Sequence, residues 1–324
     1  MVTGLDPEQR RLRIVFFGTP EFAVPSLQAL MAAGRHPVVA VVTQPDRPRG
    51  RHQRVQHTPV KAAAGGAVPV LQPERIRTPE FVALLRSFLP DLGVVAAYGK
   101  ILPDEVIAVP RLGMINVHAS LLPKYRGAAP VHRAVMAGER ETGVTIMRVI
   151  RELDAGPMFA RATRPIGPDD TSDAVERDLA RLGAELLVAV VDQLAEGTAH
   201  EEPQDASQAT YAPKITREDG LIDWSKPARA IHDQVRGLYP WPHAYTFFRG
   251  ERLIVLRTRV EPAAAYPPRP GTVLHVSREA IPVVAGDGAV VVIDRLQPEG
   301  KRAMSAREFL AGRPVVPGVV LGPS

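Results

Sequence analysis

The sequence predicts an α/β protein with two domains, a doubly wound parallel sheet followed by a smaller antiparallel β-barrel. Through residues 1–200, short β-branched runs alternate with helical stretches, which is the pattern of a parallel sheet. From residue 214 onward, short apolar runs recur between glycine and proline turns, as in small barrels. A chain of 324 residues also exceeds the usual size of one compact domain.

The expected strands of the first domain are short apolar runs closed by turn residues. The first run, 13–17, ends in Gly18-Thr19-Pro20, and a helix over 22–31 ends near Gly34. These elements form a strand, a turn and a helix. Further strands are expected at 38–42, 68–71, 92–96, 114–118, 145–150 and 158–162, and further helices at 79–89 and 171–194.

The chain becomes polar after the last of these helices. Residues 198–213 are rich in Glu, Gln, Asp and Ser, which indicates a connection between domains. Beyond it we expect one helix over 227–237 and short strands at 253–256, 271–276, 281–284 and 289–293. We therefore assign residues 1–200 to a first domain, 201–213 to a linker and 214–324 to a second domain.

Composition excludes several kinds of site. The chain has no cysteine, which excludes disulfides, thiolate zinc sites and cysteine nucleophiles. No run approaches the roughly 20 apolar residues that a membrane helix needs, and residues 1–13 lack the apolar centre of a signal peptide. His, Asp and Glu show no recognisable ligand spacing, so no metal is expected. We expect a soluble, cytoplasmic protein with no membrane partner.

The positive charge is unevenly distributed along the chain. Residues 1–210 hold 24 basic and 24 acidic side chains, whereas residues 211–324 hold 16 and 11, so the whole excess of +5 lies in the last third. A second basic segment, 35–61, has Asp46 as its only acidic residue. Two separate basic surfaces favour a polyanionic partner, with nucleic acid the leading candidate. The alternative is that arginine merely replaces lysine on solvated surfaces.

The candidate catalytic residues lie at strand ends, where open α/β sheets bind their ligands. The turn after the first strand is not G-x-G-x-x-G and no P-loop is present, which weakens the case for a nicotinamide or P-loop nucleotide site. In the run 114–118, the period of two places Asn116 and His118 on the same face. Asp154 follows the next strand in a glycine-containing turn. An amide, an imidazole and a carboxylate suit acyl transfer by oxyanion support, proton transfer and imidazolium stabilisation.

The sequence around these residues resembles a known family. The segment Asn116-Val-His-Ala-Ser-Leu-Leu-Pro-Lys-Tyr-Arg-Gly-Ala-Ala-Pro130 is similar to the signature N-x-H-x-S-x-L-P-x-x-x-G of folate-dependent formyltransferases. The resemblance implies a Rossmann-like catalytic domain, an OB-like C-terminal domain and 10-formyltetrahydrofolate as formyl donor. By matching positions it makes Asn116, His118 and Asp154 catalytic. It assigns reduced-folate contacts to Ser120, Leu121, Leu122 and Pro123.

Further motifs extend the resemblance over nearly the whole chain, towards the branch of that family that formylates the methionine carried by initiator tRNA. They are Phe17-Gly-Thr-Pro-Glu-Phe-Ala23, Leu153-Asp-Ala-Gly-Pro157, Tyr211-Ala-Pro-Lys-Ile-Thr216, Gly220-Leu-Ile-Asp-Trp224 and Tyr239-Pro-Trp-Pro242. Initiator methionyl-tRNA is then the implied acceptor.

In that branch a basic loop after the second strand contacts the tRNA acceptor arm. Here it corresponds to residues 44–54, with Arg47, Arg49, Arg51 and Arg54 as the implied contacts. Its Pro, Gly and Arg content also predicts a phosphate-binding loop without regular structure. His52 stands where the branch has glycine, and Ala119 replaces a common glycine inside the signature.

Three alternatives remain open from the sequence. Another formyltransferase of the same family could act on a nucleotide-linked amino sugar or on glycinamide ribonucleotide, but it would not require the charged loop and basic second domain. A formyl-folate hydrolase could use the same three residues, with no evident use for two basic surfaces. An RNA-binding protein could retain the α/β domain in an inactive form, but the intact set of Asn116, His118 and Asp154 argues against this.

Overall fold

The computed structural model describes residues 11–49, 54–263, 268–275 and 279–323. Its contacts divide the chain into two compact units, and the chain passes between them several times. The first unit consists of residues 1–127, 142–164 and 176–211, and the second of 128–141, 165–175 and 212–324. Among the described residues, no helix is both long enough and apolar enough to cross a membrane.

The first unit is built on a seven-stranded sheet in the order β10-β9-β7-β6-β1-β2-β5. Strands β1, β2, β5, β6 and β7 run parallel, and β9 pairs with β7 in the antiparallel sense. The bounds of these strands are β1 Ile14–Gly18, β2 Val38–Val42, β5 Val70–Leu71, β6 Leu92–Ala96, β7 Met114–His118, β9 Glu141–Arg148 and β10 Met158–Pro165. The expected parallel α/β sheet is confirmed, and the antiparallel edge makes it a mixed one.

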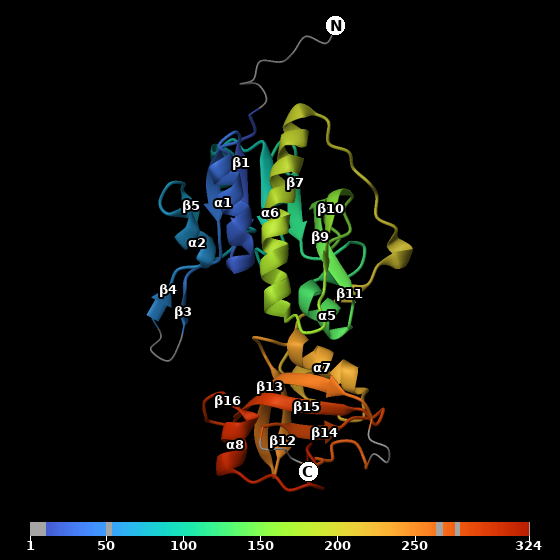
Figure 1. Ribbon diagram of the computed structural model, residues 1–324. Helices are drawn as coiled ribbons and strands as arrows, with labels where there is room; N and C mark the ends of the chain where they lie inside the picture. The colour runs from blue at the N-terminus through green and yellow to red at the C-terminus, as the bar shows by residue number, and fades with distance from the viewer. Residues whose placement is uncertain (1–10, 50–53, 264–267, 276–278, 324) are drawn as a thin grey trace. The chain divides into compact units, whose positions relative to one another are not determined.

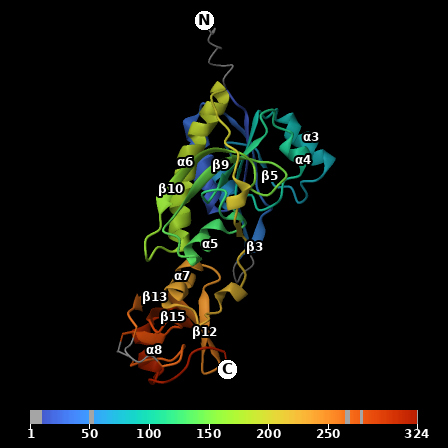
Figure 2. The same ribbon diagram turned by 90° about the vertical axis from the view of Figure 1, so that its right-hand side faces the viewer.

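Helices cover both faces of this sheet. In Figure 1, α1 (Val24–Ala33) and α6 (Ser172–Glu196) lie in front of the strands, and Figure 2 shows α3 (Pro79–Ser87) and α4 (Asp104–Ile107) on the side away from α6. Every residue of β1 is buried, as expected of a parallel strand covered on both faces. Threonine starts two helices: Thr78 caps α3, and Thr58 caps α2 (Pro59–Ala64) by accepting a backbone N–H.

The sheet has a topological switch point between β1 and β6. From β1 the chain builds outward through β2 to β5, then returns to the other side of β1 for β6 and β7. In open α/β sheets, ligands bind beyond the carboxyl ends of the strands near such a point. Gly18, Ala96 and His118 end β1, β6 and β7 at this edge. The candidate catalytic strand is therefore in the expected part of the fold.

The second unit contains a five-stranded antiparallel sheet in the order β12-β13-β15-β14, with β16 also paired to β15. The strands are β12 Ala244–Phe248, β13 Glu251–Glu261, β14 Ile281–Val284, β15 Val290–Pro298 and β16 Met304–Ser305, and the helices are α5 Pro130–Met136, α7 Ala228–Gly237 and α8 Ala306–Gly312. Helix α7 confirms the expectation over 227–237. The sheet and helices enclose a core that includes Trp224, Ile231 and Phe309.

One expected strand of this unit is wrong. Residues 271–276 were expected to form a strand, but only isolated bridges occur there, from Thr272 to Val320 and from Val273 to Val283, and Val276 lies outside the described residues. Gly271 has a φ of +83°, which extended strands do not adopt. The apolar side chain of Val273 is buried without forming a continuous ladder. Burial, and not strand pairing, accounts for this apolar run.

Candidate active site

Strand β7 places the candidate amide and imidazole at the carboxyl edge of the first unit. Asn116 pairs with Val95 of β6 and with Met147 of β9, so the backbone around it is held on both sides. Its side chain is half-buried, and no described residue hydrogen-bonds its amide. Partly buried amides usually find a partner within the protein. Asn116 departs from this rule, so its amide donors are free to bind a ligand.

The imidazole of His118 is buried, with 5% of the residue exposed, and oxygens face both of its ring nitrogens. Nε2 lies 3.0 Å from the backbone oxygen of Tyr125, and Nδ1 lies 3.7 Å from Oδ2 of Asp154. A carbonyl oxygen only accepts, so Nε2 carries the proton in that hydrogen bond. An imidazolium, which donates from both nitrogens, would have an acceptor oxygen on each side.

Asp154 lies in a tight turn whose backbone approaches the end of β9. Its φ is +49°, in the left-handed region that few side chains other than Asn and Asp adopt readily. Its Oδ2 accepts a hydrogen bond of 2.8 Å from the backbone N–H of Gly127. A Cβ on Gly156 would lie 2.0 Å from the carbonyl oxygen of Arg148, so the close approach requires glycine. The glycine-containing motif thus directs the carboxylate towards His118.

Gln204 stabilises this turn, a role that the sequence analysis did not predict. Its Nε2 donates to the backbone oxygens of Asp154 (2.8 Å) and Gly156 (2.7 Å). Its Oε1 accepts from Nε and Nη2 of buried Arg126, at 3.1 and 2.7 Å. Gln204 lies in the polar segment expected to be a linker, and a single glutamine there carries no pattern that could predict such contacts.

The segment expected to contact folate divides into buried and half-exposed side chains. Ser120 is fully buried and its hydroxyl donates to the backbone oxygen of Lys124 at 2.6 Å, while Leu122 packs against Met147 and Met158. Leu121 and Pro123 are half-exposed, and these two side chains can contact a ligand directly. Thr145 supports the segment by donating to the Ser120 oxygen at 2.7 Å.

The basic loop forms a regular structure, contrary to expectation. Residues Arg47–Arg49 (β3) pair with Arg54–Gln56 (β4) as an antiparallel hairpin, which we call the basic arm. The side chain of Arg47 is exposed. Arg51 lies outside the described residues, and only the backbones of Arg49 and Arg54 are described. The Pro and Gly content of this segment concealed a strand pairing in which Arg47 lies opposite Gln56 and Arg49 opposite Arg54.

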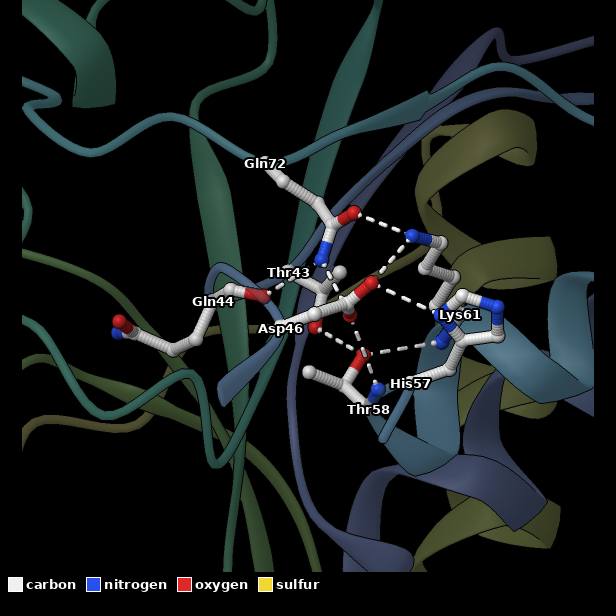
Figure 3. Close-up of polar contacts among 7 residues, drawn as sticks. All are labelled: Thr43, Gln44, Asp46, His57, Thr58, Lys61 and Gln72. Carbon is white, nitrogen blue, oxygen red and sulfur yellow. Dashed lines mark hydrogen bonds and ion pairs between the residues drawn. The ribbon is translucent and has the colours of Figure 1, made fainter. Parts of the chain in front are cut away.

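The basic arm begins just beyond the carboxyl end of β2, which runs parallel to β7 in the same sheet. It therefore leaves the sheet at the edge that carries His118. Figure 3 shows a cluster of polar side chains where the arm joins the sheet. Within the described part of the chain, no group of three or more His, Asp or Glu could hold a metal ion.

Comparisons with known proteins agree with this architecture. Residues 12–191 match the family described as Formyl transferase, and residues 214–314 match Formyl transferase, C-terminal domain. The Methionyl-tRNA formyltransferase of Moorella thermoacetica is 49% identical over 312 residues, covering 96% of this chain and 99% of that protein. The protein of the same name from Citrifermentans bemidjiense is 47% identical, covering 96% of each.

Solved structures share the fold at low sequence identity. The N-formyltransferase from Helicobacter canadensis, in complex with folinic acid and dTDP-3-aminofucose, has a TM-score of 0.65 at 17% identity, covering 87% of this chain and 98% of its own. HypX from Aquifex aeolicus, in complex with tetrahydrofolic acid, has a TM-score of 0.62 at 19% identity, covering 93% of this chain and 47% of its own. At these identities the likeness concerns the fold alone.

Proposed function

Because the chain belongs to the family of methionyl-tRNA formyltransferases, we propose that it transfers the formyl group of 10-formyltetrahydrofolate to the amino group of initiator methionyl-tRNA. The reaction prepares the tRNA for translation initiation and takes place in the cytoplasm. The observation that carries the chemistry is the free amide of Asn116, on the same strand as a buried His118 that has an acceptor oxygen beside each ring nitrogen.

The three side chains act in order on one acyl transfer. The neutral methionyl amine adds to the formyl carbon, and Asn116 donates a hydrogen bond to the oxyanion that develops there. Because Nε2 of His118 already carries a proton towards the Tyr125 oxygen, Nδ1 takes the amine proton and returns it to the folate nitrogen as the bond from that nitrogen to the formyl carbon breaks. Asp154 stabilises the imidazolium formed between these two proton transfers. No nucleophilic side chain is required.

The residues at this edge suit a reduced folate. Leu121 and Pro123 offer half-exposed apolar surface beside the catalytic strand, while Ser120 and Leu122 fix the shape of their segment from within. Ligand sites of this kind combine apolar walls with a few polar groups. We assign Ser120, Leu121, Leu122 and Pro123 to the folate site, with the two buried residues acting through their backbone and packing.

The second unit offers a cationic surface suited to RNA. A cavity of about 550 Å³ is lined by residues that include Arg257, Arg295 and His243, together with one acidic residue, Asp169. Arg257 pairs in register with Arg295 across β13 and β15, and both are exposed. We propose that residues 214–324 form an OB-like tRNA-contacting domain, joined by 201–213 to a catalytic domain of residues 1–200. The shift in register around Arg257 supports a curved sheet, because β-bulges bend strands.

A formyl-transfer assay with charged initiator and elongator tRNAs tests the function directly. We expect formylmethionyl-tRNA from the initiator substrate, dependent on 10-formyltetrahydrofolate. Parallel reactions with a nucleotide-linked amino sugar, with glycinamide ribonucleotide and with water as acceptor test the other formyltransferases and the hydrolase. Folate binding without any turnover would instead indicate an RNA-binding protein with an inactive α/β domain.

Replacing Arg47, Arg49, Arg51 and Arg54 with serine tests the basic arm. We expect a higher Michaelis constant for tRNA with unchanged folate affinity, because the second unit still binds the tRNA. The plot of log affinity against log salt should flatten by up to about 0.9 for each phosphate that the arm no longer neutralises. Measuring tRNA formylation and folate affinity across salt concentrations decides the matter. Unchanged tRNA kinetics would exclude a role for the arm in tRNA binding. A lower folate affinity would indicate damage to the catalytic unit.

Asn116→Ala tests the free amide. We expect turnover to fall by about 10²–10³-fold, with a smaller change in either substrate's Michaelis constant, if the amide supports the oxyanion. Folding should be retained, because no described residue loses a side-chain hydrogen bond. Steady-state kinetics at saturating folate and tRNA provide the comparison. A defect in binding with normal turnover would assign Asn116 to substrate positioning instead.

A further inference from the structure

The base of the basic arm holds a carboxylate that joins the arm, the sheet and helix α2 of the first unit. Asp46 comes immediately before β3, and His57 and Thr58 come immediately after β4, so the two ends of the arm meet at this point. Figure 3 shows the Asp46 carboxylate surrounded by His57, Thr58, Lys61 of α2 and Gln72, the residue that follows β5. Sheet, arm and helix therefore converge on one acidic side chain.

Four groups donate to Asp46. Oδ2 accepts from Nδ1 of His57 at 2.8 Å and from Nζ of Lys61 at 2.5 Å. Oδ1 accepts from the backbone N–H of Thr58 at 3.3 Å and from Nε2 of Gln72 at 2.7 Å. An ionised carboxylate has about four acceptor positions, so these donors use all of them. Asp46 therefore has no acceptor position left for a substrate.

The same cluster is fastened to the sheet. Gln72 donates to the backbone oxygen of Gln44 at 3.0 Å and accepts from Lys61 at 2.7 Å. Beneath it, the hydroxyls of Thr43 and Thr58 are 2.8 Å apart, and both residues are buried. Thr43 and Gln44 follow β2, and Gln72 follows β5. The ends of two neighbouring strands and the start of α2 thus form a fixed platform for the arm.

The carboxylate is held in its charged form. The side chain of Asp46 is 15% exposed, and the hydrogen bond from Lys61, reinforced by those from Gln72 and His57, lowers the pKa of this carboxyl far below its ordinary value. Loss of one partner from such a cluster leaves the other groups partly unsatisfied. The Asp46 carboxylate therefore keeps its charge, and replacing any one of its partners disturbs the others.

We infer that Asp46 is a positioning residue that sets the direction in which the basic arm leaves the sheet, and so presents its arginines to tRNA. The inference rests on the proposed function of the arm. It differs from an electrostatic role for Asp46, because a negative charge beside an RNA-binding arm opposes binding. If Asp46 fastens the arm, its substitution weakens tRNA binding. If Asp46 only repels the RNA, the same substitution strengthens tRNA binding.

Asp46→Asn separates these two predictions. If Asp46 fastens the arm, the Michaelis constant for charged tRNA rises, roughly 5- to 30-fold for the loss of one or two kcal/mol of positioning. Turnover at saturating tRNA and the affinity for folate stay near their normal values. If the carboxylate matters only as a charge, the substitution tightens tRNA binding. Asp104→Asn, an exposed residue of α4 in the same unit, makes the same change in charge away from the arm.

A double-mutant cycle with Lys61→Gln tests whether the pair acts as a unit. Lys61→Gln should raise the same Michaelis constant, and the double variant should be no worse than the more defective single variant. Effects that multiply would mean that each residue acts separately, which would overturn the fastening role. A fall in folate affinity in Asp46→Asn would also overturn it, because the residue would then shape the catalytic site and not the arm alone.

A distance measurement tests the inference without tRNA. The chain has no cysteine, so Gln56→Cys on β4 and Ala83→Cys on α3 would carry the only two spin labels. We expect a narrow distance distribution between the labels with Asp46 present and a broader or shifted one with Asp46→Asn. An unchanged distribution would exclude positioning. If the distribution broadens but the four-arginine variant formylates tRNA normally, the arm is fastened as inferred and its proposed role in binding RNA is wrong.

Discussion

His118→Ala is expected to lower turnover by about 10²–10⁴-fold, the usual effect of losing a general acid–base group. The imidazole is the one group described at the site with an acceptor oxygen on each side, at 3.0 Å and 3.7 Å, so no neighbouring side chain can replace it. Folate and tRNA binding should change little. Single-turnover kinetics with both substrates saturating measure the chemical step directly.

The control for this variant must separate chemistry from packing. His118→Ala removes a buried side chain and the hydrogen bond that it donates to the Tyr125 oxygen, so the free energy of unfolding should fall. His36→Ala is a matched variant, because His36 is equally buried. Its ring is hydrogen-bonded to the backbone N–H of Leu12 and to Asp192, near the start of β1 and not at the carboxyl edge that carries His118. Both variants should lose stability, and only His118→Ala should lose turnover. Near-normal turnover would remove His118 from the mechanism.

The elements that the sequence predicted best are those whose structure depends on the local pattern of apolar and turn residues. The strands 38–42, 92–96 and 114–118 have the expected bounds, because each is a short apolar run closed by polar or turn residues. Asn116 and His118 could be paired for the same reason, since the period of two within one strand fixes their common face. Strand β9 begins at Glu141, earlier than expected, because its polar first residues conceal the extent of the strand.

Contacts between distant segments were beyond prediction from periodicity. Gln204 and Arg126 are 78 residues apart, and nothing in either local sequence announces that together they hold the turn of Asp154. The Tyr125 oxygen that orients His118 is a backbone atom, which carries no residue-type signal. The hairpin of the basic arm was missed because Pro, Gly and Arg are typical of loops, although strand pairing needs only free backbone groups.

Asp154→Asn is expected to lower turnover by about 10²–10⁴-fold, as is typical when proton transfer fails. Asparagine keeps the size of the side chain, and its oxygen can still accept from Gly127, so the turn should persist. What is lost is a negative charge 3.7 Å from Nδ1 of His118. Unit charges about 4 Å apart interact by about 4 kcal/mol at an effective dielectric of 20. That energy corresponds to roughly 10³-fold in rate.

Gln204→Ala tests whether Asp154 acts through its negative charge or through the geometry of its turn. It removes two hydrogen bonds to the backbone around Asp154 but leaves the carboxylate charged. If charge is what matters, Asp154→Asn should be far more defective in single turnover than Gln204→Ala, although Gln204→Ala loses more thermal stability. Equal losses of turnover would show that the turn's geometry, and not the carboxylate's charge, limits the reaction. Normal turnover in Asp154→Asn would leave His118 to act with the Tyr125 oxygen alone.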